Sequence, residues 1–127
     1  MSDDVLRALD ARAARDEPAL LWWRDDDATV PTPALDQLLE IAAQYQVPVT
    51  LAVIPATTGD ALALRLDTAP LANIAVHGWS HKNHAPATEK KQELGAHRPL
   101  DAVLVDLAAG LAKLSDLHGA RMVPVLV

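Results

Sequence analysis

Three consecutive carboxylates follow an apolar run near the start of the chain. The run over residues 20–23 leads through Arg24 into Asp25, Asp26 and Asp27. Like charges held this close together are unfavourable unless a cation or a proton compensates them. Neighbouring side chains of a strand point in opposite directions, so one carboxylate could bind a metal ion while a neighbour acts as general base. The alternative is a solvated acidic turn that Arg24 neutralises.

A pair of histidines follows a second apolar run. His77 and His81 are four residues apart, a spacing that on a helical turn places both imidazoles on one side, where they can share a cation. Two solvated loop histidines would show the same spacing. Active sites of α/β proteins are built from the loops after parallel strands. We therefore expect the carboxylates and the histidines, which both follow strand-like runs, to form one divalent metal site.

The ligand types restrict the metal chemistry. The chain contains no cysteine, so any metal must be bound by histidine and carboxylate. One aspartate and two histidines leave coordination positions open, as catalytic zinc sites do, and zinc is the metal we expect. Manganese, cobalt or iron would accept the same ligands.

Two further polar residues have two interpretations each, and a third has one. His84 is either a third imidazole near the metal or a loop residue. Arg98 either pairs with an active-site carboxylate, which would set its orientation, or is a surface residue before a helix. His118 falls at the carboxyl end of a predicted helix, where a positive charge is favourable, and we interpret it as structural.

Apolar periodicity predicts alternating helices and strands. Spacings of three and four residues indicate helices, and short runs rich in β-branched residues indicate strands. Such alternation predicts the α/β class with parallel strands. Over 61–66, leucines at alternate positions are compatible with a strand as well as with a short helix. The predicted elements are helices over 3–15, 33–45, 61–66 and 101–118, and strands over 19–23, 47–54, 71–76 and 122–127.

Local signals predict the ends and the faces of two of these helices. Thr32 followed by Pro33 is a typical helix start, with threonine as the N-cap. In the last helix Gly119 is placed as a C-cap, and Gly110 could allow close packing. The polar stretch 77–99 before this helix is long enough to be functional or mobile. The expected buried stripe of the helix comprises Leu104, Leu107, Leu111, Leu114 and Leu117.

Composition places residues 1–127 in a single globular domain. Half of the 127 residues are hydrophobic (50%) and 22% are charged, a balance typical of one folded domain. The net charge of −6 argues against a nucleic-acid surface. The acidic start lacks the features of a signal peptide, and no apolar run is long enough to span a membrane. We therefore expect a cytoplasmic protein without a membrane partner.

The order of the motifs resembles the polysaccharide deacetylase family, carbohydrate esterases related to chitooligosaccharide deacetylases. The shared order is strand–Asp-Asp, then a strand, then strand–His-x-x-x-His. A bacterial deacetylase-like subgroup is more similar still. It carries Arg-Asp-Asp-Asp and His-Gly-Trp-x-His-x-Asn-His stretches, and the Glu-Lys-Lys-x-Glu-Leu-Gly-x-His-Arg-Pro segment that here spans residues 89–99. The resemblance covers nearly the whole chain from Leu20 onward.

The resemblance implies a fold, an activity and a set of site residues. The family has a distorted (β/α) barrel and removes acetyl groups from N-acetylated sugars with a metal-bound water. It implies Asp25 as the catalytic base and Asp26, His77 and His81 as the metal ligands. Asp27 then stands where the family usually has glycine.

Two departures from the family accompany these implications. Gly78 stands where the better-known members have serine or threonine. The family's later motifs, among them the histidine that acts as general acid, would begin beyond Val127. The chain is therefore expected to correspond to the N-terminal half of the barrel, with Asp27, Arg24, His84 and Arg98 as candidates for supporting the metal ligands.

Two other functions are compatible with the sequence. A catalytically inactive or truncated deacetylase-like domain would bind metal or sugar without turnover, and an exposed sheet edge would favour homo-oligomers. A small open α/β domain, flavodoxin-like in outline, would use the carboxylates for Mg²⁺ and a phosphate, although no glycine-rich phosphate loop is present. For the hydrolase, the substrate is expected to be a carbohydrate or a small amide.

Overall fold

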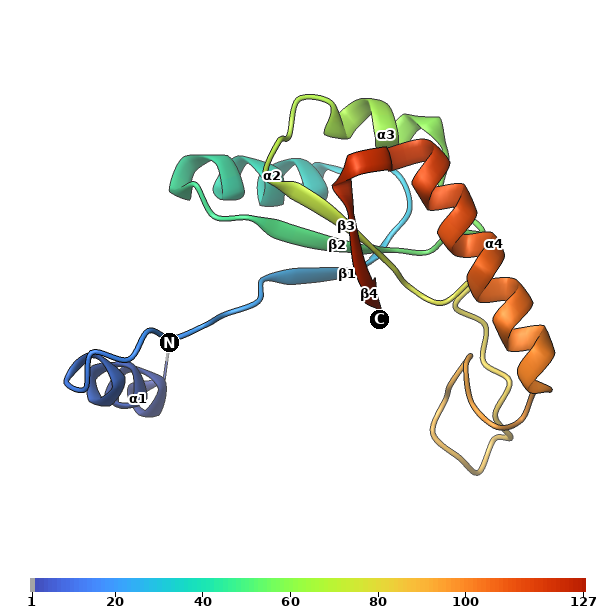
Figure 1. The fold of residues 1–127 in the computed structure, drawn as a ribbon, viewed down its shortest axis with the longest axis horizontal. Coiled ribbons are helices and arrows are strands. Elements are labelled where there is room, and N and C mark those ends of the chain that lie inside the picture. Colours follow the sequence, from blue (N-terminus) through green and yellow to red (C-terminus); the bar gives the residue numbers. More distant parts are fainter. Residues whose placement is uncertain (1) are drawn as a thin grey trace.

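Four parallel strands form one sheet in the order in which they occur along the chain. The computed structural model describes residues 2–127, and its strands are β1 (Arg24–Ala28), β2 (Val49–Val53), β3 (Ala72–Val76) and β4 (Met122–Leu126). Each strand pairs with the next in the order β1-β2-β3-β4 (Figure 1). Helices alternate with these strands, which confirms the predicted α/β class.

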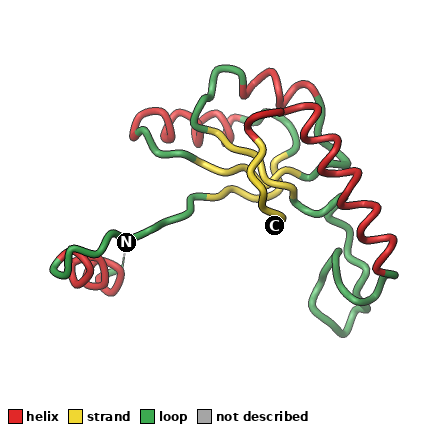
Figure 2. The backbone as a smooth tube through the Cα atoms, in the orientation of Figure 1, coloured by secondary structure: helices red, strands yellow, loops and turns green. Residues whose placement is uncertain are grey.

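Three helices cover one face of the sheet. They are α2 (Pro33–Tyr45), α3 (Asp60–Leu66) and α4 (Leu100–His118), and a 3₁₀ turn, η1 (Gly119–Arg121), follows α4 (Figure 2). All three contribute to one apolar core with alternate residues of β2 and β3. Helices on a single face of a parallel sheet are the arrangement of half a (β/α) barrel. The core comprises Leu35, Leu39, Ala42, Val49, Leu51, Val53, Leu62, Leu66, Ala69, Ala72, Ile74, Val76 and Leu114.

The predicted helix ends are confirmed. The Thr32 hydroxyl accepts a hydrogen bond from the Leu35 backbone N–H at 3.1 Å, with Pro33 as the first residue of α2. Such a cap satisfies one of the amide groups that have no partner inside the helix. Gly119 ends α4 with a φ of 53°, a backbone conformation that glycine adopts without strain. The segment over 61–66 is helical, as part of α3.

The first strand lies closer to the carboxylates than the sequence predicted. The prediction of a core strand over 19–23 is wrong, because Leu20 and Leu21 are 94% and 86% exposed. Pairing with β2 begins at Trp23, whose carbonyl accepts from the Thr50 N–H, and β1 itself contains all three aspartates. An apolar run therefore does not identify this strand. The ladder partners supplied by β2 determine where it begins.

The buried face of α4 also differs from the predicted stripe. Leu114 is fully buried, but Leu104 and Leu111 are each 53% exposed. The helix packs instead through Val103, Gly110, Leu114 and His118. A Cβ at position 110 would lie 2.9 Å from the Pro55 Cγ and 3.3 Å from the Gly78 carbonyl oxygen. Gly110 thus allows the close packing that was predicted, and of the predicted stripe only Leu114 is fully buried, whereas Leu104 and Leu111 face solvent.

The N-terminal helix α1 (Asp3–Ala13) stands apart from the sheet. It is the amphipathic helix predicted from residue 3, and an extended segment joins it to β1 (Figure 1). Its apolar residues Val5 and Leu6 are 45% and 44% exposed. Of the helices within residues 2–127, none is both long enough and apolar enough to cross a membrane.

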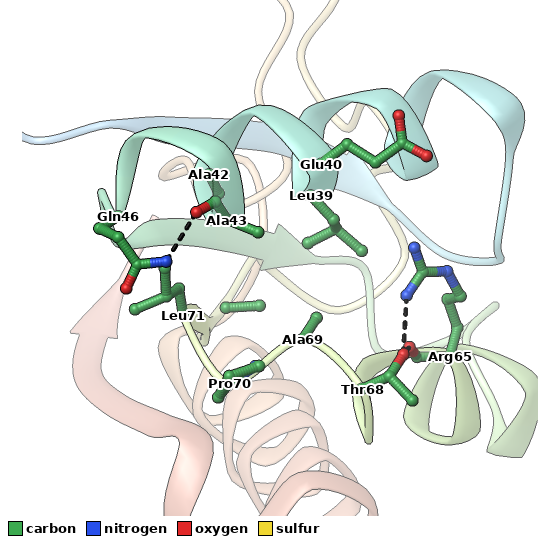
Figure 3. A pocket seen from close by; sticks show the side chains of 11 residues that line it. Leu39, Glu40, Ala42, Ala43, Gln46, Arg65, Thr68, Ala69, Pro70 and Leu71 are labelled. Carbon is green, nitrogen blue, oxygen red and sulfur yellow. Dashed lines mark hydrogen bonds between the residues drawn. The ribbon is translucent and has the colours of Figure 1, made fainter.

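A cavity of about 260 Å³ lies beside the amino ends of β2 and β3 (Figure 3). Its walls are mostly apolar residues of α2 and of the segment that leads into β3. At one end Arg65 donates a hydrogen bond to the Thr68 hydroxyl at 3.3 Å. Ligand sites of parallel sheets lie at the carboxyl ends of the strands, so this cavity is at the opposite edge from a site of that kind.

Truncating α4 at two leucines tests which face of the helix is buried. Leu114→Ala should lower the free energy of unfolding by about 2–5 kcal/mol, because it leaves a cavity in the core. Leu111→Ala, the matched control on the exposed side, should change it by about 0.5 kcal/mol or less. Urea unfolding measures both values. Equal losses in the two variants would contradict the observed orientation of α4.

His118 is buried at the end of α4, which agrees with the structural role predicted for it, although it does not have the solvated environment that favours a cation there. It is 7% exposed, and its Nε2 has no hydrogen-bond partner within residues 2–127. Burial, with a smaller contribution from the positive charge of Arg121, lowers the pKa of His118 below its usual 6.5. A cation at a helix carboxyl end is favourable only where water or a partner solvates it.

The unfolding free energy should therefore depend on pH through His118. In the unfolded chain the imidazole takes up a proton near pH 6.5, whereas the folded protein resists protonation. The unfolded state then binds more protons, and stability falls as the pH drops below about 6.5. His118→Gln should flatten this decline between pH 7 and pH 5, and His84→Gln, an exposed control, should not. A decline of equal slope in His118→Gln would exclude this origin.

Candidate metal centre

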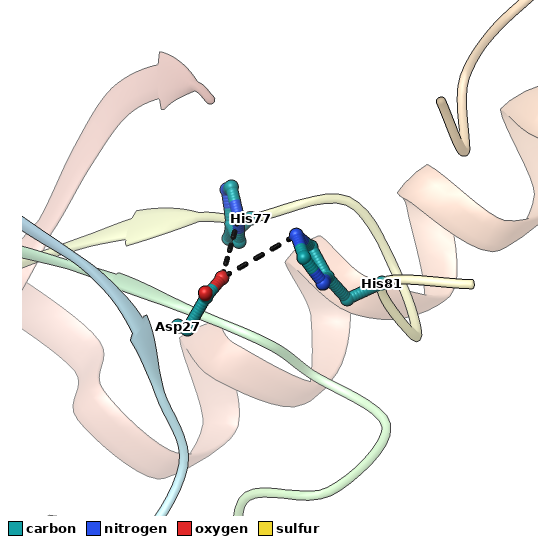
Figure 4. Close-up of side chains that lie close together, drawn as sticks. All are labelled: Asp27, His77 and His81. Atoms are coloured by element: carbon teal, nitrogen blue, oxygen red, sulfur yellow. Dashed lines mark ion pairs between the residues drawn. The ribbon is translucent and has the colours of Figure 1, made fainter. Parts of the chain in front are cut away.

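One carboxylate and two imidazoles converge at the carboxyl ends of β1 and β3. The Asp27 Oδ1 lies 3.0 Å from the His77 Nε2 and 3.4 Å from the His81 Nε2 (Figure 4). The two rings are stacked, with centroids 5.0 Å apart and an interplanar angle of 29°. Within residues 2–127, this is the one group of three or more histidine, aspartate or glutamate side chains whose ligand atoms approach closely enough to hold a metal ion.

The spacing of these ligand atoms suits a divalent metal. In a tetrahedral zinc site with bonds of 2.0–2.1 Å, ligand atoms lie about 3.3 Å apart. The observed distances of 3.0 and 3.4 Å from Asp27 bracket that value. Three protein ligands leave at least one coordination position open, as in catalytic sites. The same ligands accept other divalent metals, so the geometry supports a metal site without identifying the metal.

The carboxylate that meets the histidines belongs to Asp27, whereas the resemblance assigned this position to Asp26. The register between β1 and β2 shifts between Asp25 and Ala28, and Asp27 has a φ of 67°. Such a bulge inserts an extra residue and turns its side chain out of the regular alternation. Asp27 therefore reaches the edge of the sheet where His77 and His81 lie.

Asp26 pairs with Arg24, whose ladder partner Thr50 is on the sheet face that the helices leave uncovered. On that face, the Trp22 indole donates to the Thr50 hydroxyl at 3.0 Å, and the Arg24 guanidinium lies over the Trp22 ring. The Arg24 Nε and Nη2 contact the two oxygens of Asp26 at 2.7 and 3.0 Å. Arg24 thus neutralises Asp26 and leaves Asp27 to the histidines.

Asp25 has a different environment. In the ladder it is the partner of Leu51, which belongs to the core on the helix-covered face. It lines a cavity of about 300 Å³ together with its two acidic neighbours and with Leu35 and Leu38. Partial burial raises the pKa of Asp25 above its usual value, and the negative charges nearby raise it further.

A backbone carbonyl orients the first imidazole. The His77 Nδ1 lies 3.0 Å from the Val127 carbonyl oxygen. Because a carbonyl only accepts hydrogen bonds, Nδ1 carries the proton and the Nε2 lone pair points toward Asp27. Metal-binding histidines usually have such a partner on the second ring nitrogen. The Val127 N–H donates to the Val76 carbonyl at 2.9 Å, so pairing at the end of β4 holds this carbonyl in place.

The loop that carries both histidines is irregular. The spacing of four suggested a helical turn, but Gly78 and His81 have φ angles of 55° and 57°, in the left-handed region. The backbone instead wraps around the side chain of Glu93, which accepts hydrogen bonds from Trp79, Ser80 and His81. Partial burial alone would raise the pKa of Glu93, but these hydrogen bonds outweigh it and the pKa lies below its usual value.

Helix α4 and β2 support the loop from the other side. The His77 N–H donates to the Val53 carbonyl at 2.9 Å, and the Ala56 N–H donates to the Trp79 carbonyl at 2.8 Å. Lys113 of α4 donates to the Pro55 carbonyl at 2.7 Å. These contacts connect the loop that carries the two imidazoles to β2 and α4.

The remaining candidates lie away from the three ligand atoms. His84 is exposed, and its backbone N–H donates to the Gln92 carbonyl. Arg98 pairs with Asp106 of α4 at 2.6 Å rather than with a carboxylate of the site. The His84 contact is within the long loop, and the Arg98 contact joins the loop to α4. Neither of them involves the candidate centre.

Glu93 is the residue of this site that the sequence interpretation missed. It lies inside the segment 89–99 that carried the family resemblance, but a single glutamate in a polar loop gives no periodic signal. The contact depends on the path of a loop without regular structure. Only the folded backbone brings residues 79–81 to the Glu93 carboxylate.

Comparison with known proteins adds no family to this picture: no family model, no curated protein and no solved structure matches the chain. The fold and the site define an α/β protein with a candidate divalent-metal centre at the carboxyl edge of a parallel sheet.

Three aspartate variants distinguish the possible ligands. Asp27→Asn should weaken zinc binding by more than about 100-fold. Loss of a group that only supports a ligand typically lowers metal affinity by about 10–100-fold, and loss of a direct ligand should lower it further. Asp26→Asn and Asp25→Asn should leave the affinity nearly unchanged. Isothermal titration calorimetry of the metal-free proteins gives the three constants. A large loss in Asp26→Asn with none in Asp27→Asn would restore the assignment taken from the resemblance.

Proposed function

We propose that this protein is a metal-dependent hydrolase that removes an acyl group, such as acetyl, from an N-acylated carbohydrate or a similar small amide. The observation that carries the proposal is the convergence of the Asp27 carboxylate with the Nε2 atoms of His77 and His81. The motif order resembling polysaccharide deacetylases supplies the reaction class. Zinc is the metal we favour, and we place the protein in the cytoplasm.

Asp27, His77 and His81 would hold the metal. A divalent ion held by these residues would supply Lewis-acid chemistry, activating a water molecule and polarising the substrate carbonyl. The protein's own contribution is to keep three ligand atoms in place and to leave at least one coordination position open.

Asp26 is the general base in this proposal. In the resemblance, the base is the residue directly before the aspartate that binds the metal. Because the ligand is here assigned to Asp27 and not to Asp26, the base is assigned to Asp26 and not to Asp25. Asp26 is exposed, and Arg24 fixes its orientation through two contacts. A base must first be within reach of the proton that it removes. Asp25 is exposed as well, but its ladder partner Leu51 places it on the opposite side of β1 from Arg24.

A second function is favoured by the same ion pair. Arg24 occupies both oxygens of Asp26, which opposes proton transfer to that carboxylate. A domain that binds metal or sugar without turnover would need only the three ligands and no free base. Self-association through the exposed sheet edge remains a separate prediction.

Acetate release separates the two functions. The zinc-loaded protein is incubated with an N-acetylglucosamine oligomer and with a small N-acetyl amide. Asp26→Asn should reduce hydrolysis by about 10²–10⁴-fold, the usual contribution of a general base, while it retains zinc. Asp25→Asn is the matched control and should remain active.

Two outcomes would contradict the hydrolase as described. Zinc-loaded wild-type protein that releases no acetate from either substrate would support binding without turnover. An inactive Asp25→Asn beside an active Asp26→Asn would return the base to Asp25.

A further inference from the structure

We propose that Glu93 is a positioning residue that holds the loop over 77–81 in the shape needed to bind metal. The inference rests on the proposed metal centre. It adds a residue that acts on this centre indirectly, because Glu93 contacts the backbone of the loop and none of the three ligand atoms. It assigns a function to a residue of the long polar segment before α4.

Both oxygens of the Glu93 carboxylate are fully used by the loop. Oε2 accepts from the backbone N–H groups of Trp79 at 3.2 Å and His81 at 3.0 Å. Oε1 accepts from the Ser80 N–H at 2.8 Å and from the Ser80 hydroxyl at 3.1 Å. Three successive amides directed at one anion form a concave backbone arrangement of the kind that binds anions. Here the anion is a side chain of the same protein, which fixes the path between the two histidines.

Gly78 is required for this close approach. A Cβ at position 78 would overlap the Oε2 of Glu93, and the φ of 55° at Gly78 is in the region that favours glycine. On its other side, the Gly78 carbonyl faces Gly110 of α4. The loop is thus held between a carboxylate and a helix, and the position of His81 relative to His77 follows from both contacts.

The chemistry of the contact requires a carboxylate. Each Glu93 oxygen receives two donors and offers none. In Glu93→Gln one oxygen becomes an NH₂ group, which would face N–H donors and cannot accept from them. A substitution that conserves shape should therefore open the loop. The paired His77 and His81 rings would then lose their common orientation.

The test combines amide exchange with zinc affinity. In metal-free protein, Glu93→Gln should abolish the hydrogen-exchange protection of the Trp79, Ser80 and His81 amides, followed by NMR. It should also weaken zinc binding by about 10–100-fold, the usual effect of a group that orients a ligand. Ser80→Ala removes one of the four hydrogen bonds and should cause a smaller loss.

Glu89→Gln is the matched control in the same loop. Glu89 pairs with His97 at 3.1 Å, so its substitution perturbs the loop without touching the amides of residues 79–81. It should leave both readouts unchanged, with affinities measured well below the unfolding temperature of every variant. A purely structural role of Glu93 would lower stability but leave the zinc affinity of the folded protein unaltered.

The outcomes are distinguishable from those of the proposed function. Protection retained in Glu93→Gln, or zinc affinity equal to that of the wild type, would overturn the positioning role. If the wild-type protein binds no zinc, the proposed function fails, and the exchange of the three amides still decides whether Glu93 holds the loop.

Discussion

Parallel alignment of β1 and β3 on either side of β2 is the constraint on which the site depends. Asp27 and His77 are far apart in the chain, and they meet because parallel strands end at the same edge of the sheet. β2 lies fully buried between them. It provides the hydrogen-bond partners of both neighbouring strands and so determines at which residue each of them ends. The bulge in β1 then turns the Asp27 side chain toward the histidines. Strand pairing therefore determines where the ligand residues lie, and the bulge determines where the Asp27 carboxylate points.

Charge compensation separates three adjacent carboxylates into three environments. Asp26 is neutralised by Arg24, Asp27 lies between two imidazoles, and Asp25 is partly buried beside the core with a raised pKa. Like charges at neighbouring positions repel one another unless each has its own compensation. With the proton of His77 on Nδ1, its Nε2 lone pair faces Asp27 and supplies no positive charge. A divalent cation bound between these groups would supply that charge.

The two faces of the sheet have different functions. Large aliphatic side chains on the helix-covered face form the core, whereas the other face presents Thr50 with Trp22 and Arg24 beside it. The hydrophobic effect stabilises the covered face. On the other face Thr50, Ala52 and Ala75 are small side chains that are buried without a helix over them. The polar groups of the candidate site follow the strands at the carboxyl edge of the sheet and lie outside the core.

The sequence alone determined the α/β class, most helix and strand positions, the Thr32 cap and the involvement of one aspartate of the cluster with His77 and His81. Periodicity, capping residues and metal-binding residue types are local properties of the chain, so they can be read without a fold. It did not predict the start of β1, the buried face of α4, the choice of Asp27 or the contact of Glu93 with the histidine loop. Each of these depends on a partner distant in the chain: β2 for the strand, Pro55 and Gly78 for the helix, and the folded loop for Glu93. Only the tertiary structure decides such features, because a bulge or a close backbone contact arises from the packing of elements and leaves no periodic signal in any one of them.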